Sequence, residues 1–172
     1  MYHVNDTLLY GLHGVCRVAD ITQREWNGKR VDYYVLQPVY SDGSTFYVPV
    51  QGKTVAAKLR RALSAEEIRA LIREMPREEV LWFDNEVERR EKYKEMLARG
   101  DRRELVGIIK ALHLHQQEQQ AKGRHLHLSD EGFFRQAERL LYDEFALALG
   151  IQPDQVLPYI LEELGAEEKK TS

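Results

Sequence analysis

Two aromatic residues followed by a run of cations form the first pattern in this sequence that could do chemistry. Trp82 and Phe83 head the segment, and the chain from Arg89 to Arg124 then carries ten Lys or Arg against five Asp or Glu. This local positive excess belongs to a chain whose formal net charge is −3. A positive surface beside an apolar ring suits contact with phosphates. The alternatives are a solvated helix face for the cations and a core position for the Trp.

Histidines are the second candidate, because His113, His115, His125 and His127 lie close in the sequence. Side chains two apart on a helix point about 200° apart, so His113 and His115 cannot ligate one ion if the helix continues there. No HExxH, paired-cysteine, Walker, GxGxxG or GxSxG motif occurs. Cys16 lies in a strand-like run, which favours a small buried residue over a nucleophile. We therefore expect no catalytic residue, metal or cofactor. A metal-dependent enzyme that uses the histidines remains an alternative.

Composition is that of a chain able to bury a core, with 43% hydrophobic and 31% charged residues. The single cysteine excludes an internal disulfide and fits a reducing compartment. No apolar run approaches the roughly 18 residues that span a bilayer, and the first residues lack the pattern of a secretory leader. We expect a cytoplasmic protein without membrane contact. The segment 143–172 holds seven Asp or Glu against two Lys or Arg, so it should face away from any polyanion.

The sequence pattern in the first third of the chain is typical of β-strands. Short runs rich in Val, Ile, Thr and Tyr are separated by turn signals: TLLY, VCRVADIT, VDYYVLQPV and STFYVPV. Asn27-Gly28 predicts a tight type I′ hairpin, and Ser41-Asp42-Gly43 predicts a second turn. Four or five such strands in about 60 residues predict a small bent sheet or partly closed barrel. A sheet of this kind keeps an edge strand available for a partner, unless the chain's own next helix covers it.

From about Ala62 the apolar pattern changes to a helical period. Ser64 and Glu67 have capping-box spacing, and a helix from Ala65 should stop before Pro76. Gly100 should end a second helix, Asp101 should cap a third and Ser129 a fourth, which Gly150 ends. Pro153 should begin a last helix with an apolar face and a kink at Pro158. That face is expected to bury five residues: Val156, Leu157, Ile160, Leu161 and Leu164. We expect an α+β protein with a β domain over 1–62 and a compact bundle of about five helices over 63–172.

Several stretches together resemble the CarD and CdnL family of bacterial RNA polymerase-binding transcription regulators. They are DTLLYGLHGVCRVADI, YYVLQPV, STFYVPV, RRALSAEEI, YKEMLARGDRRELVGIIKAL and LSDEGFFRQAERLLYDEFALALGI. The resemblance implies a Tudor-like N-terminal domain, shared with transcription-repair coupling factor, that docks on the polymerase β subunit through an edge strand. It also implies a helical domain that contacts promoter DNA at the upstream edge of the melted region and stabilises the open complex.

The resemblance also implies site residues. Arg24 falls on a basic docking position, and Thr45, Phe46 and Tyr47 fall on the docking strand, although one family branch has a basic residue where Tyr47 stands. Trp82 is the candidate for a wedge that enters the minor groove; the register of some branches would place Glu86 there, but Trp82 is the only Trp near this helix.

The expected phosphate contacts are the cations that follow the Trp: Arg89, Arg90, Lys92, Lys94 and Arg124. Helical spacing cannot place all four of the helix cations on one face, so we expect about half of them to touch DNA.

These features predict a non-enzymatic transcription regulator with two partners, the RNA polymerase β subunit and promoter DNA. Affinity for DNA alone should be weak, because the whole chain is acidic, and docking on the polymerase would supply the missing strength. We expect a monomer at the polymerase, with strand exchange at the docking edge as the route to a dimer. The alternative function is an adaptor that binds RNA polymerase without a functional DNA contact.

Overall fold

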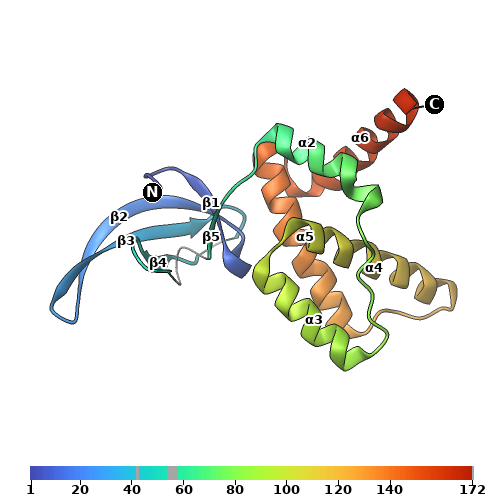
Figure 1. Cartoon of the computed structure of the whole chain (residues 1–172), viewed down its shortest axis with the longest axis horizontal. Helices are drawn as coiled ribbons and strands as arrows, with labels where there is room; N and C mark the ends of the chain where they lie inside the picture. The colour runs from blue at the N-terminus through green and yellow to red at the C-terminus, as the bar shows by residue number, and fades with distance from the viewer. Residues whose placement is uncertain (42, 54–57, 172) are drawn as a thin grey trace. The chain divides into compact units, whose positions relative to one another are not determined.

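A computed structural model describes residues 1–41, 43–53 and 58–171 of the chain, with side chains described as far as Gly165. The chain divides into two compact units, Met1–Leu63 and Ser64–Ser172. The first is a sheet and the second is built from helices (Figure 1).

The first unit is one antiparallel sheet of five strands. They are β1 (Thr7–Tyr10), β2 (Val15–Trp26), β3 (Lys29–Pro38), β4 (Phe46–Pro49) and β5 (Leu59–Arg61). Their order across the sheet is β4-β3-β2-β1-β5, so β4 and β5 are the edges and the sheet is not closed into a barrel. Figure 1 shows β2 and β3 as a long curved hairpin. Together with the helices that follow, this sheet confirms the predicted α+β fold class.

The hairpin turn forms where the Asn-Gly pair predicted it. Asn27 has φ 50° and Gly28 has φ 76°, the two positive values that a type I′ turn needs. The turn sets Trp26 opposite Lys29 and thereby fixes the register of both strands. Of the second predicted turn, Asp42 lies outside the described residues.

Apolar residues on alternate positions form the core of the sheet unit. Leu8, Cys16, Val18 and Leu36 have no exposed surface. Burial raises the pKa of the Cys16 thiol to about 11, so the thiolate that a nucleophile needs is disfavoured. The interpretation of Cys16 as a small core residue is confirmed.

Five α-helices make up the described part of the second unit. They are α2 (Ala65–Glu74), α3 (Glu86–Arg99), α4 (Arg102–Ala121), α5 (Leu128–Leu149) and α6 (Val156–Thr171). The capping box of Ser64 and Glu67 begins α2, and Asp101 accepts the backbone N–H groups of Arg103 and Glu104 at the start of α4. These two predicted N-termini are confirmed. Gly100 and Gly150 end α3 and α5 in the left-handed conformation, as expected.

The predicted cap of α5 is wrong. Leu128 is already helical and His127 is the N-cap residue, so Ser129 lies inside the first turn. The next residue, Asp130, is buried instead of facing solvent as a first-turn acid would.

The apolar face predicted for α6 is only half right. Val156 and Ile160 are buried, but Leu157 is 46% and Leu161 is 62% exposed. Both leucines border an apolar groove of about 430 Å³ between α4, α5 and α6. Pro153 starts a 3₁₀ turn that leads into the helix, and Pro158 falls in the first turn of α6, where a missing N–H removes no helical bond. In the part of the chain that the structure describes, no helix is long and apolar enough to cross a membrane.

Gly107 in α4 allows the segment before α3 to pass close to the helix. A Cβ there would lie 2.7 Å from the backbone oxygen of Glu79 and 2.7 Å from side-chain carbons of Leu81. The Leu81 N–H donates to the Gly107 oxygen at 3.1 Å, so the contact is a backbone docking point. A methyl group would force the segment away.

We expect Gly107→Ala to lower the free energy of unfolding of the helical unit by about 1–2 kcal/mol, because overpacking costs about 1–3 kcal/mol and helix propensity returns up to about 1. Urea denaturation followed by far-UV circular dichroism measures the change. The control is Gly132→Ala in α5, where a Cβ meets nothing within 4 Å and stability should rise by up to about 1 kcal/mol. Equal stability of the two variants would show that the close approach is not a constraint.

Candidate functional site

An open strand edge is the first candidate surface. Among the described residues, β4 pairs with β3 and has no strand on its other side. The Val50 N–H donates to the Asp32 oxygen at 2.9 Å, and Val48 stands opposite Tyr34. Because hydrogen-bonded positions alternate along an antiparallel strand, the backbone groups of Tyr47 and Pro49 point to the outer edge. Pro49 has no N–H, so Tyr47 is the residue of β4 with both a donor and an acceptor directed outward.

Arg24 and Tyr47 come together on one face of the sheet, although they belong to β2 and β4. The Arg24 Cζ lies 4.0 Å from the centroid of the Tyr47 ring, a cation–π contact. Tyr47 is 46% exposed and Arg24 is also exposed, so the pair is presented to solvent. The structure thus joins two of the four residues that the sequence proposed for polymerase binding.

The other two residues divide between the surface and the core. Thr45 is exposed directly before β4. Phe46 is half-buried, with its ring 5.5 Å from the Tyr10 ring and 4.1 Å from the His13 ring between centroids. The Phe46 side chain therefore packs against the core of the sheet unit.

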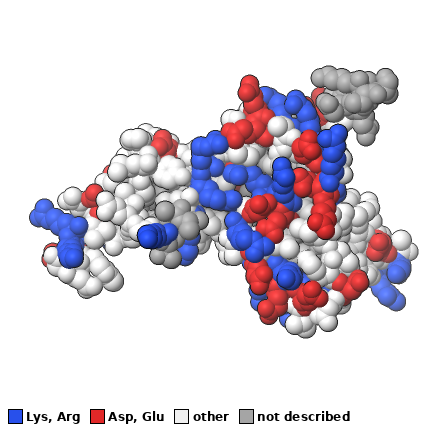
Figure 2. Space-filling view, viewed as in Figure 1, with Lys and Arg blue, Asp and Glu red and all other residues white. Residues whose placement is uncertain are grey.

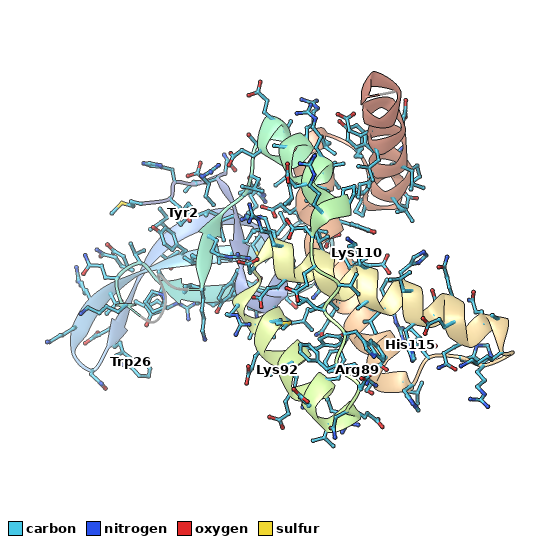
Figure 3. All side chains as sticks on the ribbon, turned by 45° about the vertical axis from the view of Figure 1, so that its right-hand side comes forward. Tyr2, Trp26, Arg89, Lys92, Lys110 and His115 are labelled. Atoms are coloured by element: carbon cyan, nitrogen blue, oxygen red, sulfur yellow. The ribbon has the colours of Figure 1, made fainter. Side chains whose placement is uncertain are left out.

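Trp26 extends this face and was missed from the sequence. It lies at the tip of the β2–β3 hairpin with 65% of its surface exposed (Figure 3). Because side chains alternate along a strand, Trp26 and Arg24 share one face of the sheet. The sequence did contain a signal for it, namely a large aromatic residue directly before an Asn-Gly turn. The tip of a two-stranded hairpin has no core around it, so a Trp at this position is expected to be exposed.

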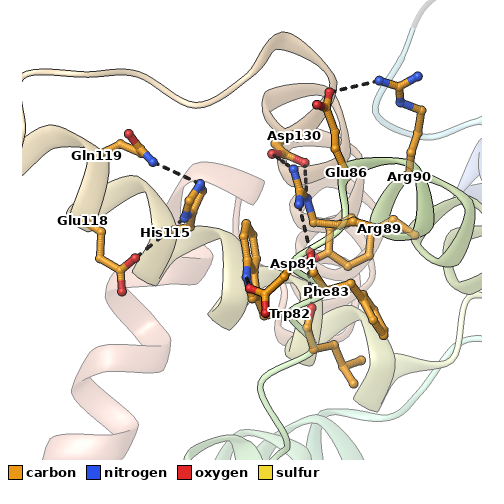
Figure 4. Close-up of polar contacts among 12 residues, drawn as sticks. Trp82, Phe83, Asp84, Glu86, Arg89, Arg90, His115, Glu118, Gln119 and Asp130 are labelled. Carbon is orange, nitrogen blue, oxygen red and sulfur yellow. Dashed lines mark hydrogen bonds and ion pairs between the residues drawn. The ribbon is translucent and has the colours of Figure 1, made fainter.

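Trp82 lies in the irregular segment before α3, in the helical unit, and its indole is partly buried. The ring centroid is 4.2 Å from that of His115, and the Arg89 Cζ is 4.5 Å from the ring centroid. The indole Nε1 donates to the Asp84 carboxylate at 3.0 Å. Figure 4 shows the indole between His115 and Arg89, with Asp84 beside it. The indole therefore has packed neighbours on both sides, and only part of it reaches solvent.

Buried side chains anchor the backbone on both sides of Trp82. The Tyr93 hydroxyl donates to the Leu81 oxygen at 2.7 Å, and the Arg89 Nη1 donates to the Phe83 oxygen at 2.9 Å. Burial raises the pKa of Tyr93, against the opposing effect of the nearby Arg89 charge, so its hydroxyl stays a donor.

Arg89 does not meet solvent, which corrects its assignment as a phosphate contact. It is 4% exposed, and its Nε and Nη2 donate to the two oxygens of Asp130 at 3.0 and 2.9 Å. Asp130 is 2% exposed. A guanidinium that is 4% exposed and already donates to the Asp130 carboxylate and to the Phe83 carbonyl is not accessible to a phosphate.

Arg90 and Lys94 lie on the side of α3 that faces α5. They line a shallow groove of about 570 Å³ to which α5 contributes Arg135 and Arg139. The remaining lining residues are uncharged: Ser129, Gly132, Phe133 and Gln136. Arg90 also pairs with Glu86 at 3.1 Å across one helical turn. The groove gathers four cations without an acidic lining residue, and the two from α5 were missed because they follow Arg124 in the sequence.

Lys92 and Arg124 are exposed but do not line this groove. A helix turns by about 100° per residue, so Lys92 points away from the side that Arg90 and Lys94 share. Arg124 lies in the connection between α4 and α5. Arg90 and Lys94 thus share one side of α3 and Lys92 does not, as helical spacing predicted; that about half of these cations touch DNA stays a prediction.

His113 and His115 point to different surroundings, as their spacing predicted. His113 borders the apolar groove, which Glu138 also lines, whereas the His115 ring lies against that of Trp82. Within the described ranges, no group of three or more His, Cys, Asp or Glu side chains is placed to hold a metal ion.

Comparison with known proteins agrees with the two-part organisation. Residues 2–62 match the family model of the CarD-like/TRCF RID domain, which covers the sheet unit. No curated protein matches the chain. The matched family is an RNA polymerase-interacting domain and is not catalytic. The predicted resemblance to CarD-like proteins is thereby confirmed for residues 2–62, which match the RNA polymerase-interacting domain that these proteins share with transcription-repair coupling factor.

Proposed function

We propose that this protein is a transcription regulator that docks on the RNA polymerase β subunit and contacts promoter DNA at the upstream edge of the melted region, stabilising the open complex. The observation that carries the proposal is the family match of the sheet unit, whose β4 edge is open in the described structure and bears the exposed Arg24–Tyr47 pair. Through the polymerase the protein would be held at the nucleoid.

Docking by strand addition follows from the outer edge of β4. A strand of the β subunit would pair with the outward N–H and C=O of Tyr47, and main-chain hydrogen bonds would supply much of the affinity. Arg24 would add charge complementarity to an acidic partner surface and fix the register. Trp26 on the same face would add apolar contact area at the hairpin tip.

DNA contact by the helical unit rests on the cationic groove and on Trp82. Arg90, Lys94, Arg135 and Arg139 are spaced over two helices and would meet neighbouring phosphates of one strand. The accessible part of the Trp82 indole would pack against an unstacked base step in the minor groove. Unstacking costs a few kcal/mol per step, so the ring would favour DNA that is already bent or opening.

An adaptor without functional DNA contact is the second candidate. Figure 2 shows Lys and Arg interleaved with Asp and Glu over the visible face of the helical unit, and the chain as a whole is acidic. Such a surface gives weak attraction to DNA. The adaptor would bind polymerase equally well but would show no salt-sensitive interaction with promoter DNA.

Arg24→Glu should weaken binding to an isolated β-subunit lobe by about tenfold or more, because it replaces attraction by repulsion at the docking face. The matched control is Arg30→Glu, which makes the same charge change on the opposite face of the same hairpin and should alter affinity by less than about twofold. Titration calorimetry measures both. Equal affinities for the two variants would remove Arg24 from the docking face.

Trp82→Ala should keep polymerase binding but lose most of the effect on open-complex lifetime, because the ring would act only where DNA is melted. Lifetimes are measured by competitor challenge of promoter complexes, with the host polymerase and with and without this protein. Leu161→Ala, which removes an exposed apolar residue of α6, is the control and should leave the lifetime unchanged. An unchanged lifetime with Trp82→Ala would exclude the wedge and favour the adaptor.

Arg135→Gln should weaken polymerase-assisted binding to promoter DNA and reduce the salt dependence of that binding by about one phosphate contact. Lys92→Gln removes one charge from α3 outside the groove and should have a smaller effect on the slope. Binding is followed by fluorescence anisotropy of labelled promoter DNA over a range of salt concentrations. If Lys92→Gln changes the slope more than Arg135→Gln does, the DNA path does not follow the groove.

A further inference from the structure

The buried Arg89–Asp130 pair touches the Trp82 indole as well as the backbone beside it. From these contacts we infer that Arg89 and Asp130 are positioning residues that set the orientation of the Trp82 ring. This inference rests on the proposed role of Trp82 at the promoter, and it assigns to two buried residues a function beyond holding helices together.

Arg89 makes three kinds of contact at once. Two of its nitrogens bind Asp130 of α5, a third binds the Phe83 carbonyl next to Trp82, and its Cζ lies 4.5 Å from the centroid of the Trp82 ring. In Figure 4 the dashed contacts converge on Arg89 between the ring and Asp130. The guanidinium therefore links the ring, the backbone that carries it and a helix that lies 41 positions further along the chain.

Asp130 fixes where that guanidinium lies. The Asp130 carboxylate is 2% exposed, and both of its oxygens accept hydrogen bonds from Arg89. A bidentate pair sets the plane of the guanidinium, which a single contact to an ammonium group does not do. Asp130 thus acts on Trp82 through Arg89 and touches neither the indole nor DNA.

The other side of the ring is fixed as well. His115 of α4 stacks on the indole with an interplanar angle of 34°, and Tyr93 holds the Leu81 carbonyl on the preceding residue. The backbone is therefore hydrogen-bonded at the residue before Trp82 and at the residue after it. The ring itself packs against His115 of α4 and Arg89 of α3. Ordering a free side chain on binding costs about 0.5–1.5 kcal/mol, and a ring that is already oriented avoids this loss.

Arg89→Lys is the variant that separates positioning from stability. Lysine keeps a positive charge for Asp130 but loses the planar fork, so the bond to Phe83 and the contact over the ring cannot both persist. In a Trp26→Phe background Trp82 is the only tryptophan, because the chain has two. We expect Arg89→Lys to raise the acrylamide quenching constant of Trp82 by about twofold and to lower its fluorescence anisotropy.

The matched control is Arg99→Lys in the same helix. Arg99 also binds a carboxylate through two nitrogens, since its Nε and Nη2 donate to the two Glu104 oxygens at 3.0 and 2.7 Å, but the cation that lies over the Trp82 ring is Arg89. Quenching should not change in this variant. Unchanged quenching in Arg89→Lys, or an equal change in Arg99→Lys, would overturn the positioning role.

A double-mutant cycle gives the functional readout, in the chain with Trp26 intact. Arg89→Lys should shorten the open-complex lifetime in the presence of Trp82 and have no effect when Trp82→Ala is also present. An equal effect in both backgrounds would assign the pair to stability alone and overturn the inference. If Trp82→Ala has no effect on lifetime, the wedge of the proposed function fails, while the quenching result still decides the positioning.

Asp130→Asn is the second variant in case Arg89→Lys does not fold. Asparagine keeps the shape and one acceptor oxygen but removes the charge, and the same rise in quenching is expected. Circular dichroism confirms that each variant retains its helices before quenching is measured. Loss of the fold in both variants would make the pair a structural element only and would end the positioning assignment.

Discussion

The buried ion pair between Arg89 and Asp130 connects α3 to α5 and, through the Phe83 carbonyl, to the segment that carries Trp82. Removing two charges from water costs several kcal/mol per ion, and this cost is recovered only when the geometry satisfies every polar group. Here the carboxylate takes two guanidinium nitrogens and the Phe83 carbonyl takes a third. The pair therefore fixes α3, α5 and the irregular segment before α3 to one another. The spacing of the four groove cations follows from it, since two come from α3 and two from α5.

The apolar periodicity of the sequence was sufficient for the class of fold and for most helix ends, but it failed where a charged residue occupies an apolar position. Arg89 stands four residues before Tyr93, and Asp130 stands three before Phe133, so each lies on the buried stripe of its own helix. Their residue types suggested that Arg89 is a solvated cation and Asp130 an exposed first-turn acid, whereas helical spacing would have placed both side chains in the core of the helical unit. Two opposite charges on the apolar stripes of two helices are a usable signal of a buried pair, because neither tolerates burial alone.

Contacts between segments distant in sequence could not be read from local patterns. The strand β5 lies directly before the point at which the apolar pattern changes to a helical period, and its pairing with β1 makes it the second edge of the sheet. Arg24 reaches Tyr47 across β3, a meeting that depends on the register of three strands. The groove likewise joins Arg90 and Lys94 to arginines from a helix that begins beyond the basic block. Counting charges over one stretch of sequence therefore finds the two groove cations of α3 and misses the two of α5.

The modest charge of the groove fits a protein that reaches DNA only after docking. Four cations, of which Arg90 pairs with Glu86, would give weak attraction in a chain of net charge −3, so free protein would not be held on the excess of non-promoter DNA. Docking through the sheet unit would raise the local concentration of the helical unit at the promoter and would make a weak contact sufficient. A more basic surface would bind double-stranded DNA without regard to sequence and would lower the fraction of the protein that is bound to polymerase. In the proposed function, a pre-oriented ring would instead concentrate the binding energy on the melted state, in which a base step would be open to receive it.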